Sequence, residues 1–112
     1  MSNPFSMVAV VRLAVEPAWL ALTRAERRVF AEQLAGIIAR YPRVKVRWFD
    51  ADVLGHGFTD FALCEFEELF AYHALWEELR DTAVFSFPYM RLVDASLGLE
   101  RAYERYEAEH GA

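Results

Sequence analysis

The stretch Arg43–Phe66, RVKVRWFDADVLGHGFTDFALCEF, decides the fold of this chain. Its two outer parts alternate in side-chain type at every second residue, which is the period of a half-buried β-strand. The segment 50–57 between them contains Gly55 and Gly57, and glycines give the backbone the freedom that a turn requires. We therefore expect a hairpin of two antiparallel strands with residues 50–57 as its turn region.

Each predicted strand of the hairpin has two different faces. In the first strand one face holds Val44, Val46 and Trp48, and the other holds Lys45, Arg47 and Phe49. In the second strand one face holds Thr59, Phe61 and Leu63, and the other holds Asp60, Ala62 and Cys64. We expect the more hydrophobic set of each strand to be covered by helices, which leaves the set that carries the charges on an open face.

The flanking segments complete a β-α-β-β-α-β order. We expect a strand over 5–13, a short helical turn from Pro17, a helix that starts at the capping box Thr23–Glu26 and runs to about Tyr41, a helix over 67–80, a strand over 87–94 and a helix over 99–109. This order predicts an α+β, ferredoxin-like fold, in which two helices cover one face of a four-stranded antiparallel sheet. Residues 1–112 form a single domain in this interpretation, with an additional C-terminal helix.

The composition favours a protein that associates with itself. A hydrophobic share of 55% and an aromatic share of 15% are high for a chain of 112 residues. Part of the apolar surface should therefore be covered by another subunit. We expect a homodimer, because closed two-fold assemblies are the commonest oligomers.

Charge and hydropathy exclude several classes of partner. The net charge of −5 argues against nucleic acid, which requires a clustered basic surface. The longest apolar run, Met7–Val11, is far too short to span a membrane, and no signal-peptide pattern surrounds it. The single cysteine, Cys64, fits a reducing compartment. We expect a soluble cytoplasmic protein with neither nucleic acid nor membrane as a partner.

The open face of the predicted sheet is the expected functional surface. It holds Lys45, Arg47, Phe49, Asp60, Ala62, Cys64, Tyr89, Arg91 and Val93. A surface that is both apolar and charged suits packing against the same surface of a second chain, with a cavity and a few convergent polar groups between them. The occupant of that cavity would be a small hydrophobic metabolite.

Arg47 and Asp60 are the candidate catalytic residues. An arginine presents a fork of donors to a carboxylate, and an aspartate accepts a proton or a hydrogen bond. The alternative is a structural ion pair that neutralises charge at a dimer interface. Candidate substrate contacts on or near this face are Lys45, Phe49, Cys64, Tyr89, Arg91 and His56.

Two of these candidates have plain alternatives. His56 lies in the glycine-bearing turn, where it is either a proton shuttle or an exposed turn histidine. Cys64 is either a ligand contact or a small buried apolar residue. The spacing of Asp50, Asp52, His56 and Asp60 matches no metal-site geometry, so we predict no metal site. His73 is too isolated to indicate haem, and we expect no cofactor.

Three motifs relate the chain to a known family. They are P-x-W-L-x-L-x-R-x-x-R over residues 17–27, R-x-x-D-A over Arg47–Ala51, and L-R-D-T over Leu79–Thr82 followed by Pro88 and Tyr89. With these motifs, residues 8–107 resemble the darcynin family. That family is largely uncharacterised and supplies no catalytic residues to transfer. The resemblance implies a fold similar to dimeric α+β barrel proteins, which include cofactor-independent monooxygenases, polyketide cyclases and haem enzymes.

Two functions follow from these observations. The first is a small-molecule-binding dimeric barrel, either a binding protein or a cofactor-independent cyclase, monooxygenase or isomerase, for an aromatic or polyketide-like metabolite. The second is a non-catalytic interaction protein whose sheet face is filled by its partner subunit. An open cavity on the sheet face favours the first, and tightly interdigitated side chains favour the second.

Overall fold

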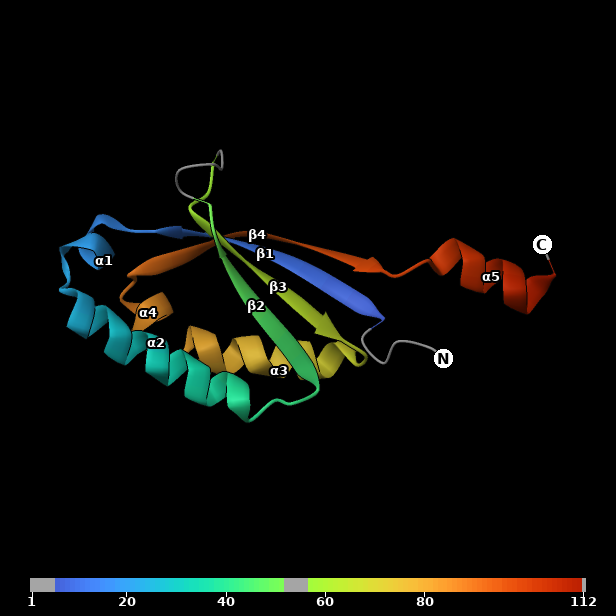
Figure 1. The fold of residues 1–112 in the computed structure, drawn as a ribbon, viewed down its shortest axis with the longest axis horizontal. Coiled ribbons are helices and arrows are strands. Elements are labelled where there is room, and N and C mark those ends of the chain that lie inside the picture. Colours follow the sequence, from blue (N-terminus) through green and yellow to red (C-terminus); the bar gives the residue numbers. More distant parts are fainter. Residues whose placement is uncertain (1–5, 52–56, 112) are drawn as a thin grey trace.

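A computed structural model of the protein describes residues 6–51 and 57–111 (Figure 1). The elements are β1 (Met7–Val15), α1 (Pro17–Ala21), α2 (Arg24–Ala39), β2 (Val44–Asp50), β3 (Asp60–Phe66), α3 (Leu69–Arg80), α4 (Ala83–Ser86), β4 (Met90–Leu99) and α5 (Ala102–His110). The predicted β-α-β-β-α-β order is confirmed, with the short helix from Pro17 and the C-terminal helix, and the short helix α4 is an addition to it.

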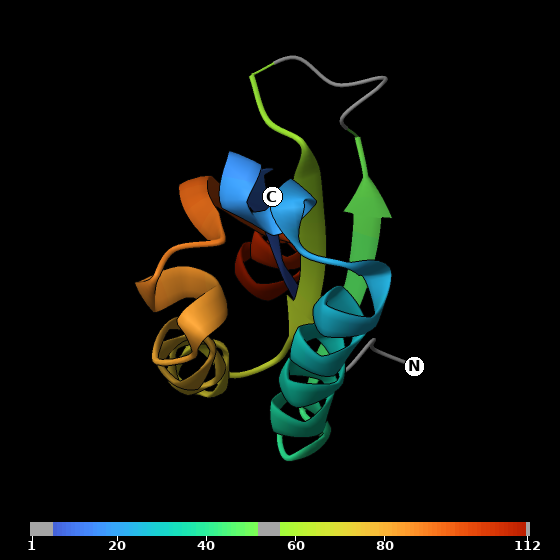
Figure 2. The same ribbon diagram turned by 90° about the vertical axis from the view of Figure 1, so that its left-hand side faces the viewer.

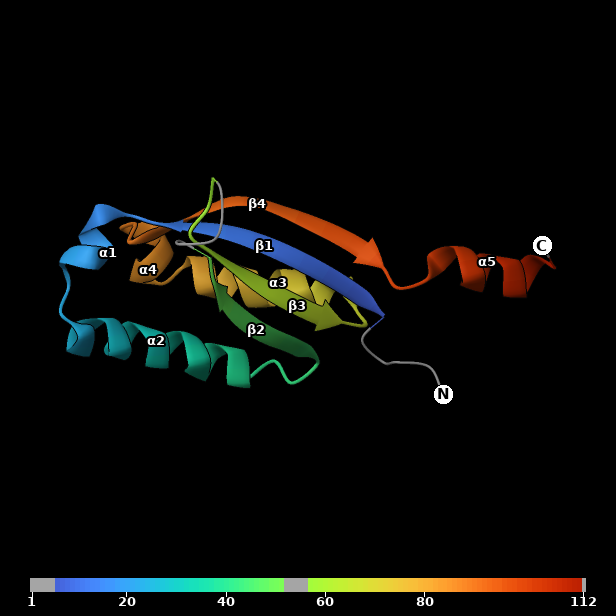
Figure 3. The ribbon, with the colours of Figure 1, turned by 45° about the horizontal axis from the view of Figure 1, so that its top comes forward.

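The four strands form one antiparallel sheet in the order β2-β3-β1-β4. The long helices α2 and α3 lie on the same side of this sheet, and the opposite side has no helix over it (Figures 1 and 2). We call the side without helices the open face. The helix α5 projects beyond the end of the sheet, and all of its residues are exposed (Figure 3).

The start of α2 follows from its sequence. The side-chain oxygen of Thr23 accepts a hydrogen bond from the backbone N–H of Glu26, and the Glu26 carboxylate accepts one from the backbone N–H of Thr23. These bonds form the predicted capping box, and they lower the pKa of Glu26. Within the described ranges, no helix combines the length and the apolar character needed to cross a membrane.

The core lies between α3 and the central strands. Leu75 and Leu79 of α3 are fully buried, as are Ala62 and Cys64 of β3. Because Ala62 and Cys64 are small, the large ring of Trp76 fits between α3 and the sheet, where it is 6% exposed. Its ring centroid lies 6.3 Å from that of Trp48 and 5.9 Å from that of Phe85.

The predicted orientation of β2 is confirmed, and that of β3 is wrong. Val46 lies opposite Cys64 and Trp48 lies opposite Ala62, so these four side chains share the helix-covered face. Phe61 and Leu63, which we expected under the helices, therefore lie on the open face. The prediction failed because each face of β3 carries apolar residues and one carboxylate, Asp60 on one face and Glu65 on the other, so alternation in polarity did not distinguish them.

A β-bulge corrects the expected alternation in β4. The pairing of β1 with β4 shifts between Arg12 and Leu13, so that Leu13 faces Leu92 while Arg12 faces Asp94. Leu92 remains on the helix-covered side, as predicted, and Asp94 moves to the open face with Arg12. The strand also begins later than expected and runs on to Leu99.

The contrast between two leucines of α3 tests this placement of the core. Leu79 is fully buried and Leu69 is 52% exposed. We expect Leu79→Ala to lower the free energy of unfolding by about 2–5 kcal/mol, because it opens a cavity against β3. The matched variant Leu69→Ala should change it by less than about 0.5 kcal/mol. Urea denaturation of both variants measures this, and equal losses would contradict the assigned core.

Candidate functional site

An ion pair crosses from β2 to β3 on the open face. The Nη2 atom of Arg47 lies 3.0 Å from the Oε1 atom of Glu65 and donates a hydrogen bond to it. The Arg47 side chain is 50% exposed and that of Glu65 is 18% exposed. The pair is therefore accessible from the solvent on the arginine side.

Stacked aromatic rings continue from this ion pair across the sheet. The guanidinium of Arg47 lies 5.8 Å from the ring centroid of Phe49, within the range of a cation–π contact. The Phe49 ring stacks on that of Phe61 at 4.8 Å between centroids, and Phe58 meets Phe61 edge-on at 6.3 Å. These rings give the open face an apolar middle.

A second ion pair closes the row on β1 and β4. The Nη1 atom of Arg12 lies 2.8 Å from the Oδ1 atom of Asp94 and 3.4 Å from the hydroxyl oxygen of Ser96. The Arg12 guanidinium also lies 5.7 Å from the ring centroid of Phe58. We call the whole row the open-face network. Its members are Arg12, Arg47, Phe49, Phe58, Phe61, Glu65, Asp94 and Ser96.

A cavity of about 450 Å³ adjoins one end of this network. It is lined by Val8, Arg47, Leu63, Glu65, Gly98, Leu99 and Glu100. Its floor is mainly apolar, and the Arg47–Glu65 pair stands at its edge. This volume falls within the range of about 300–1,000 Å³ that is usual for small-molecule sites. We call it the open-face cavity.

Three of the predicted site residues lie on the open face, on β2. Lys45, Arg47 and Phe49 alternate there with the covered residues of the strand. Arg91 also lies on the open side, opposite Ala14, and its Nε atom is 3.2 Å from the Oε1 atom of Glu16. Whether these side chains bind a ligand stays a prediction.

Asp60 and Arg47 do not form the expected pair. Arg47 lies opposite Leu63 on the open face. Asp60 lies opposite Asp50, at the other end of the strand pair. Because Asp60 and Leu63 are three residues apart, their side chains are on different faces of β3. The side chain of Asp60 accepts a hydrogen bond from the Thr59 hydroxyl at 2.7 Å. The prediction that the two residues share a face is wrong, because it followed from the wrong orientation of β3.

Tyr89 lies away from the open face. It precedes β4 and packs near Phe30 and Trp19, with ring centroids 5.1 and 6.2 Å away. It belongs to a cluster against α1 and α2, so its expected place on the open face is wrong. Among the other predicted residues, His56 lies outside the described residues, as does Asp52.

Cys64 is buried under the helices instead of lying on the open face. Its exposed fraction is 0%, which supports the alternative of a small buried apolar residue. Burial raises the pKa of the Cys64 thiol to about 11, so the thiol is protonated at neutral pH. A protonated, covered thiol is a poor nucleophile and a poor metal ligand.

The sequence interpretation missed Glu65 and Arg12 as members of the site. Each is a charged residue in an otherwise apolar strand, and each lies in the phase that faces away from the helices. The charge of Glu65 was one available indication of how β3 is oriented, because Glu65 lies on the opposite face from Ala62, Cys64 and Phe66 and a charge is costly to bury.

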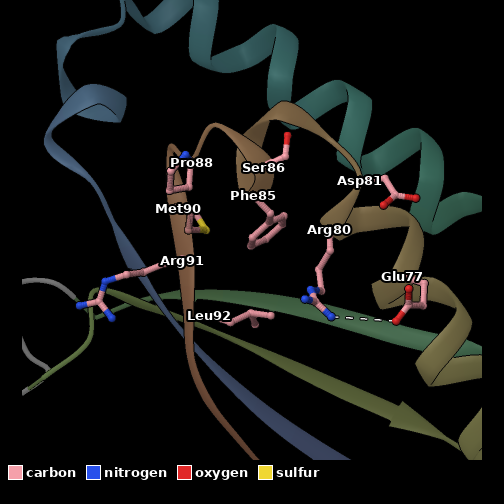
Figure 4. Close-up of a pocket in the computed structure, with 9 residues that line it drawn as sticks. All are labelled: Glu77, Arg80, Asp81, Phe85, Ser86, Pro88, Met90, Arg91 and Leu92. Carbon is pink, nitrogen blue, oxygen red and sulfur yellow. Dashed lines mark ion pairs between the residues drawn. The ribbon is translucent and has the colours of Figure 1, made fainter.

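A separate cavity lies on the helix-covered side, beside the edge strand β4. It has a volume of about 420 Å³ and is lined by Glu77, Arg80, Asp81, Phe85, Ser86, Pro88, Met90, Arg91 and Leu92 (Figure 4). Arg80 points toward Glu77 there, whereas the Arg91 side chain points away from the other lining residues. The described residues contain no cluster of three potential metal ligands.

The fold is that of a known class of α+β proteins. A haem-binding protein from Thermus thermophilus superimposes with a TM-score of 0.83 at 16% identity, over 99% of this chain and 46% of that one. A chlorite dismutase variant from Candidatus Nitrospira defluvii gives 0.80 at 20% identity, over 96% and 46%. The chain thus spans less than half the length of these solved structures.

Sequence comparison gives the family. A chain named Darcynin from Chromobacterium violaceum is 37% identical over 73 residues, which are 65% of this chain and 92% of that one. Darcynin 1 from Acinetobacter baumannii is 33% identical over 90 residues, 80% of this chain and all of that one. The Darcynin family, described as a domain of unknown function, matches residues 2–111. This chain belongs to the Darcynin family.

The linings of the two cavities above do not fit a haem group. Haem iron is held by a proximal histidine, cysteine or tyrosine, and a methionine such as Met90 serves only as a second ligand opposite a histidine. None of these three residue types is among the described residues that line the two cavities above, and Cys64 is buried and protonated. His73 is exposed on α3, where its Nε2 atom lies 3.4 Å from Glu77. We therefore derive no function that uses haem.

Thiol labelling tests the orientation of β3. At about pH 8 an exposed thiol is partly ionised and reacts readily with an aromatic disulfide reagent. We expect Cys64 to react at least about a hundredfold more slowly in the native protein than in urea, because labelling of a buried thiol requires opening of the structure. Native labelling as fast as in urea would place Cys64 on an exposed surface and contradict the assigned register.

Proposed function

We propose that this protein is a homodimer that binds a small, mainly apolar molecule with an acidic group in the open-face cavity. The observation that carries the proposal is the combination of an apolar cavity of about 450 Å³ with the Arg47–Glu65 pair at its edge. Such a cavity supplies binding energy through apolar contact and orientation through a few polar groups. Aromatic and polyketide-like acids have the matching chemistry.

Arg47 is the residue that would recognise the acidic group. A guanidinium carries five N–H donors, and the hydrogen bond from Nη2 to Glu65 engages only one side of this fork. A ligand carboxylate can therefore be held by the remaining donors, or can take the place of Glu65. Phe49 beside the guanidinium offers a ring for stacking.

Self-association is supported by the apolar surface of the described chain. Large exposed apolar side chains gather at the end of β4 and on α5, namely Leu97, Leu99, Tyr103 and Tyr106. A helix of nine residues is too short to be stable without packing. Two copies of this chain also have about the length of one chain of the solved neighbours. The free thiol of Cys64 suits a reducing compartment, so we place this dimer in the cytoplasm.

We propose binding in preference to catalysis. The candidate base Asp60 lies on the other face from Arg47, so the two cannot act on one molecule in a single subunit. A cyclase, monooxygenase or isomerase of this fold would need a different base, and Glu65 is already paired with Arg47. The second candidate, an interaction protein with a filled sheet face, is distinguished by the ligand test below.

Gly98→Val tests the cavity without disturbing the core. A side chain added at Gly98 would meet no heavy atom within 4 Å, and valine is a good strand residue. We expect wild-type protein to gain a few degrees in Tm with a panel of aromatic carboxylates, because a ligand that binds the native state stabilises it. Gly98→Val should fold and lose this gain.

The arginine variants separate recognition from general charge. Arg47→Ala should lose the gain in Tm with carboxylates, while Arg43→Ala, the matched exposed arginine just before β2, should retain it. The corresponding neutral carboxamides should give a smaller gain in wild type. If no ligand of the panel raises the Tm, or if Arg47→Ala and Gly98→Val behave like wild type, the proposed site is wrong.

The proposed dimer has its own test. Leu97, near the end of β4, is 52% exposed. We expect the wild-type protein to have the mass of a dimer in light scattering after size exclusion. Leu97→Asp should shift it toward the monomer, because a charge is then placed in the proposed apolar interface. A wild-type monomer at all concentrations would contradict the homodimer.

A further inference from the structure

The first turns of α2 carry three arginines without carboxylate partners. Arg24, Arg27 and Arg28 are spaced at i, i+3 and i+4, so they share one side of the helix. None of the three forms an ion pair with another described residue. This is unusual in a chain whose net charge is −5. The segment also overlaps residues 17–27, which carry the first of the three family motifs. None of these residues lines the open-face cavity.

Two of the carboxylates near these arginines are engaged elsewhere, and Glu32, one turn after Arg28, forms no ion pair with it. Glu26 accepts a hydrogen bond from the backbone N–H of Thr23 at 2.8 Å, as part of the capping box. Glu16 is paired with Arg91 at 3.2 Å. The N-terminus of a helix is itself the positive end of the macrodipole, so the arginines add like charge to like charge. A bound anion would relieve this repulsion.

The three arginines line a cavity together with an aromatic ring. Its volume is about 330 Å³, and its lining is Trp19, Arg24, Arg27, Arg28 and Ala31. The Nε atom of Arg27 is buried and has no hydrogen-bond partner. A buried donor without an acceptor is rare in folded proteins, so this atom points to a missing partner. The Trp19 ring is held by contacts with Phe30 and Tyr89, each at 6.2 Å between centroids.

We propose that this cavity is a second binding site, for a small molecule that carries a phosphate monoester and a planar ring. The guanidinium groups would hold the phosphate, and the planar ring would stack on Trp19. The site is separate from the open-face cavity. Trp19 lies on α1 and the arginines on α2, at the opposite end of the molecule from α5 (Figure 1).

A phosphate monoester fits this site better than a carboxylate does. It is close to dianionic at neutral pH and has three acceptor oxygens, which match several guanidinium forks at once. The helix N-terminus adds a favourable field for a doubly charged group. Trp19 supplies a flat apolar surface of the kind on which nucleobases stack. A mononucleotide is therefore a suitable probe.

Isothermal titration with three probes tests the proposal. We expect adenosine monophosphate to bind most tightly, inorganic phosphate more weakly and adenosine weakest, with affinity for the nucleotide falling as salt is raised. The indole N–H signal of Trp19, assigned with Trp19→Phe, should shift on titration. Arg24→Gln and Arg27→Gln should each weaken nucleotide binding by at least about fivefold. Arg105→Gln on α5 removes the same charge elsewhere and should bind like wild type.

The outcome that overturns the proposal is equally specific. The site is wrong if no probe binds saturably up to about 10 mM, if adenosine binds as well as its monophosphate, or if the α2 variants bind like Arg105→Gln. Arg24 is exposed, so its replacement leaves the core intact, and in low salt without phosphate Arg24→Gln should raise the Tm by relieving repulsion. Arg47→Ala changes the open-face cavity and leaves this second site unchanged. A failure of the second site can therefore be distinguished from a failure of the open-face cavity.

Discussion

The packing of α3 on β3 is the contact on which the rest of the structure depends. Trp76 and Leu79 lie against the side of β3 that carries Ala62 and Cys64, which are small enough to admit them. The side-chain period of a strand is two, so this choice places Phe61 and Glu65 on the other side. A shift of one residue would bury the charge of Glu65 and expose Phe66. The open-face network therefore follows from a contact on the opposite face.

Much of the fold could be predicted because its local rules agree. The capping box at Thr23, the apolar stripe of α2 and the alternation of β2 each indicated the correct element, and β2 was oriented correctly because Lys45 and Arg47 mark one face. In β3 polarity is nearly equal on the two faces, and side-chain size decides which is covered. The distance between α3 and the sheet, and so the side-chain volume that fits between them, cannot be read from the sequence. The large residues Phe61 and Leu63 were therefore placed there wrongly.

The candidate site was predicted in part for the same reason. Arg47 and Phe49 were placed correctly because the orientation of β2 was predicted correctly. Cys64 and Asp60 were placed on the wrong face because the orientation of β3 was predicted wrongly. Tyr89 was misplaced because its position depends on contacts with Phe30 and Trp19, which are distant in sequence. The pairing of Asp94 with Arg12 depends on a β-bulge, and a bulge leaves no regular pattern in the residues that form it.

Arginines at the two proposed sites differ in their surroundings, and this difference determines how each site would bind. Arg47 already has Glu65 as a partner, so its charge supplies only part of the binding energy of an acidic ligand, and the apolar floor of the open-face cavity would supply the rest. The arginines of α2 have no such carboxylate partner among the described residues, and the helix dipole opposes their charge. An anion there displaces only water and salt, so charge drives its binding and screening weakens it. The first site would thus combine charge with apolar contact, whereas the second would depend mainly on charge.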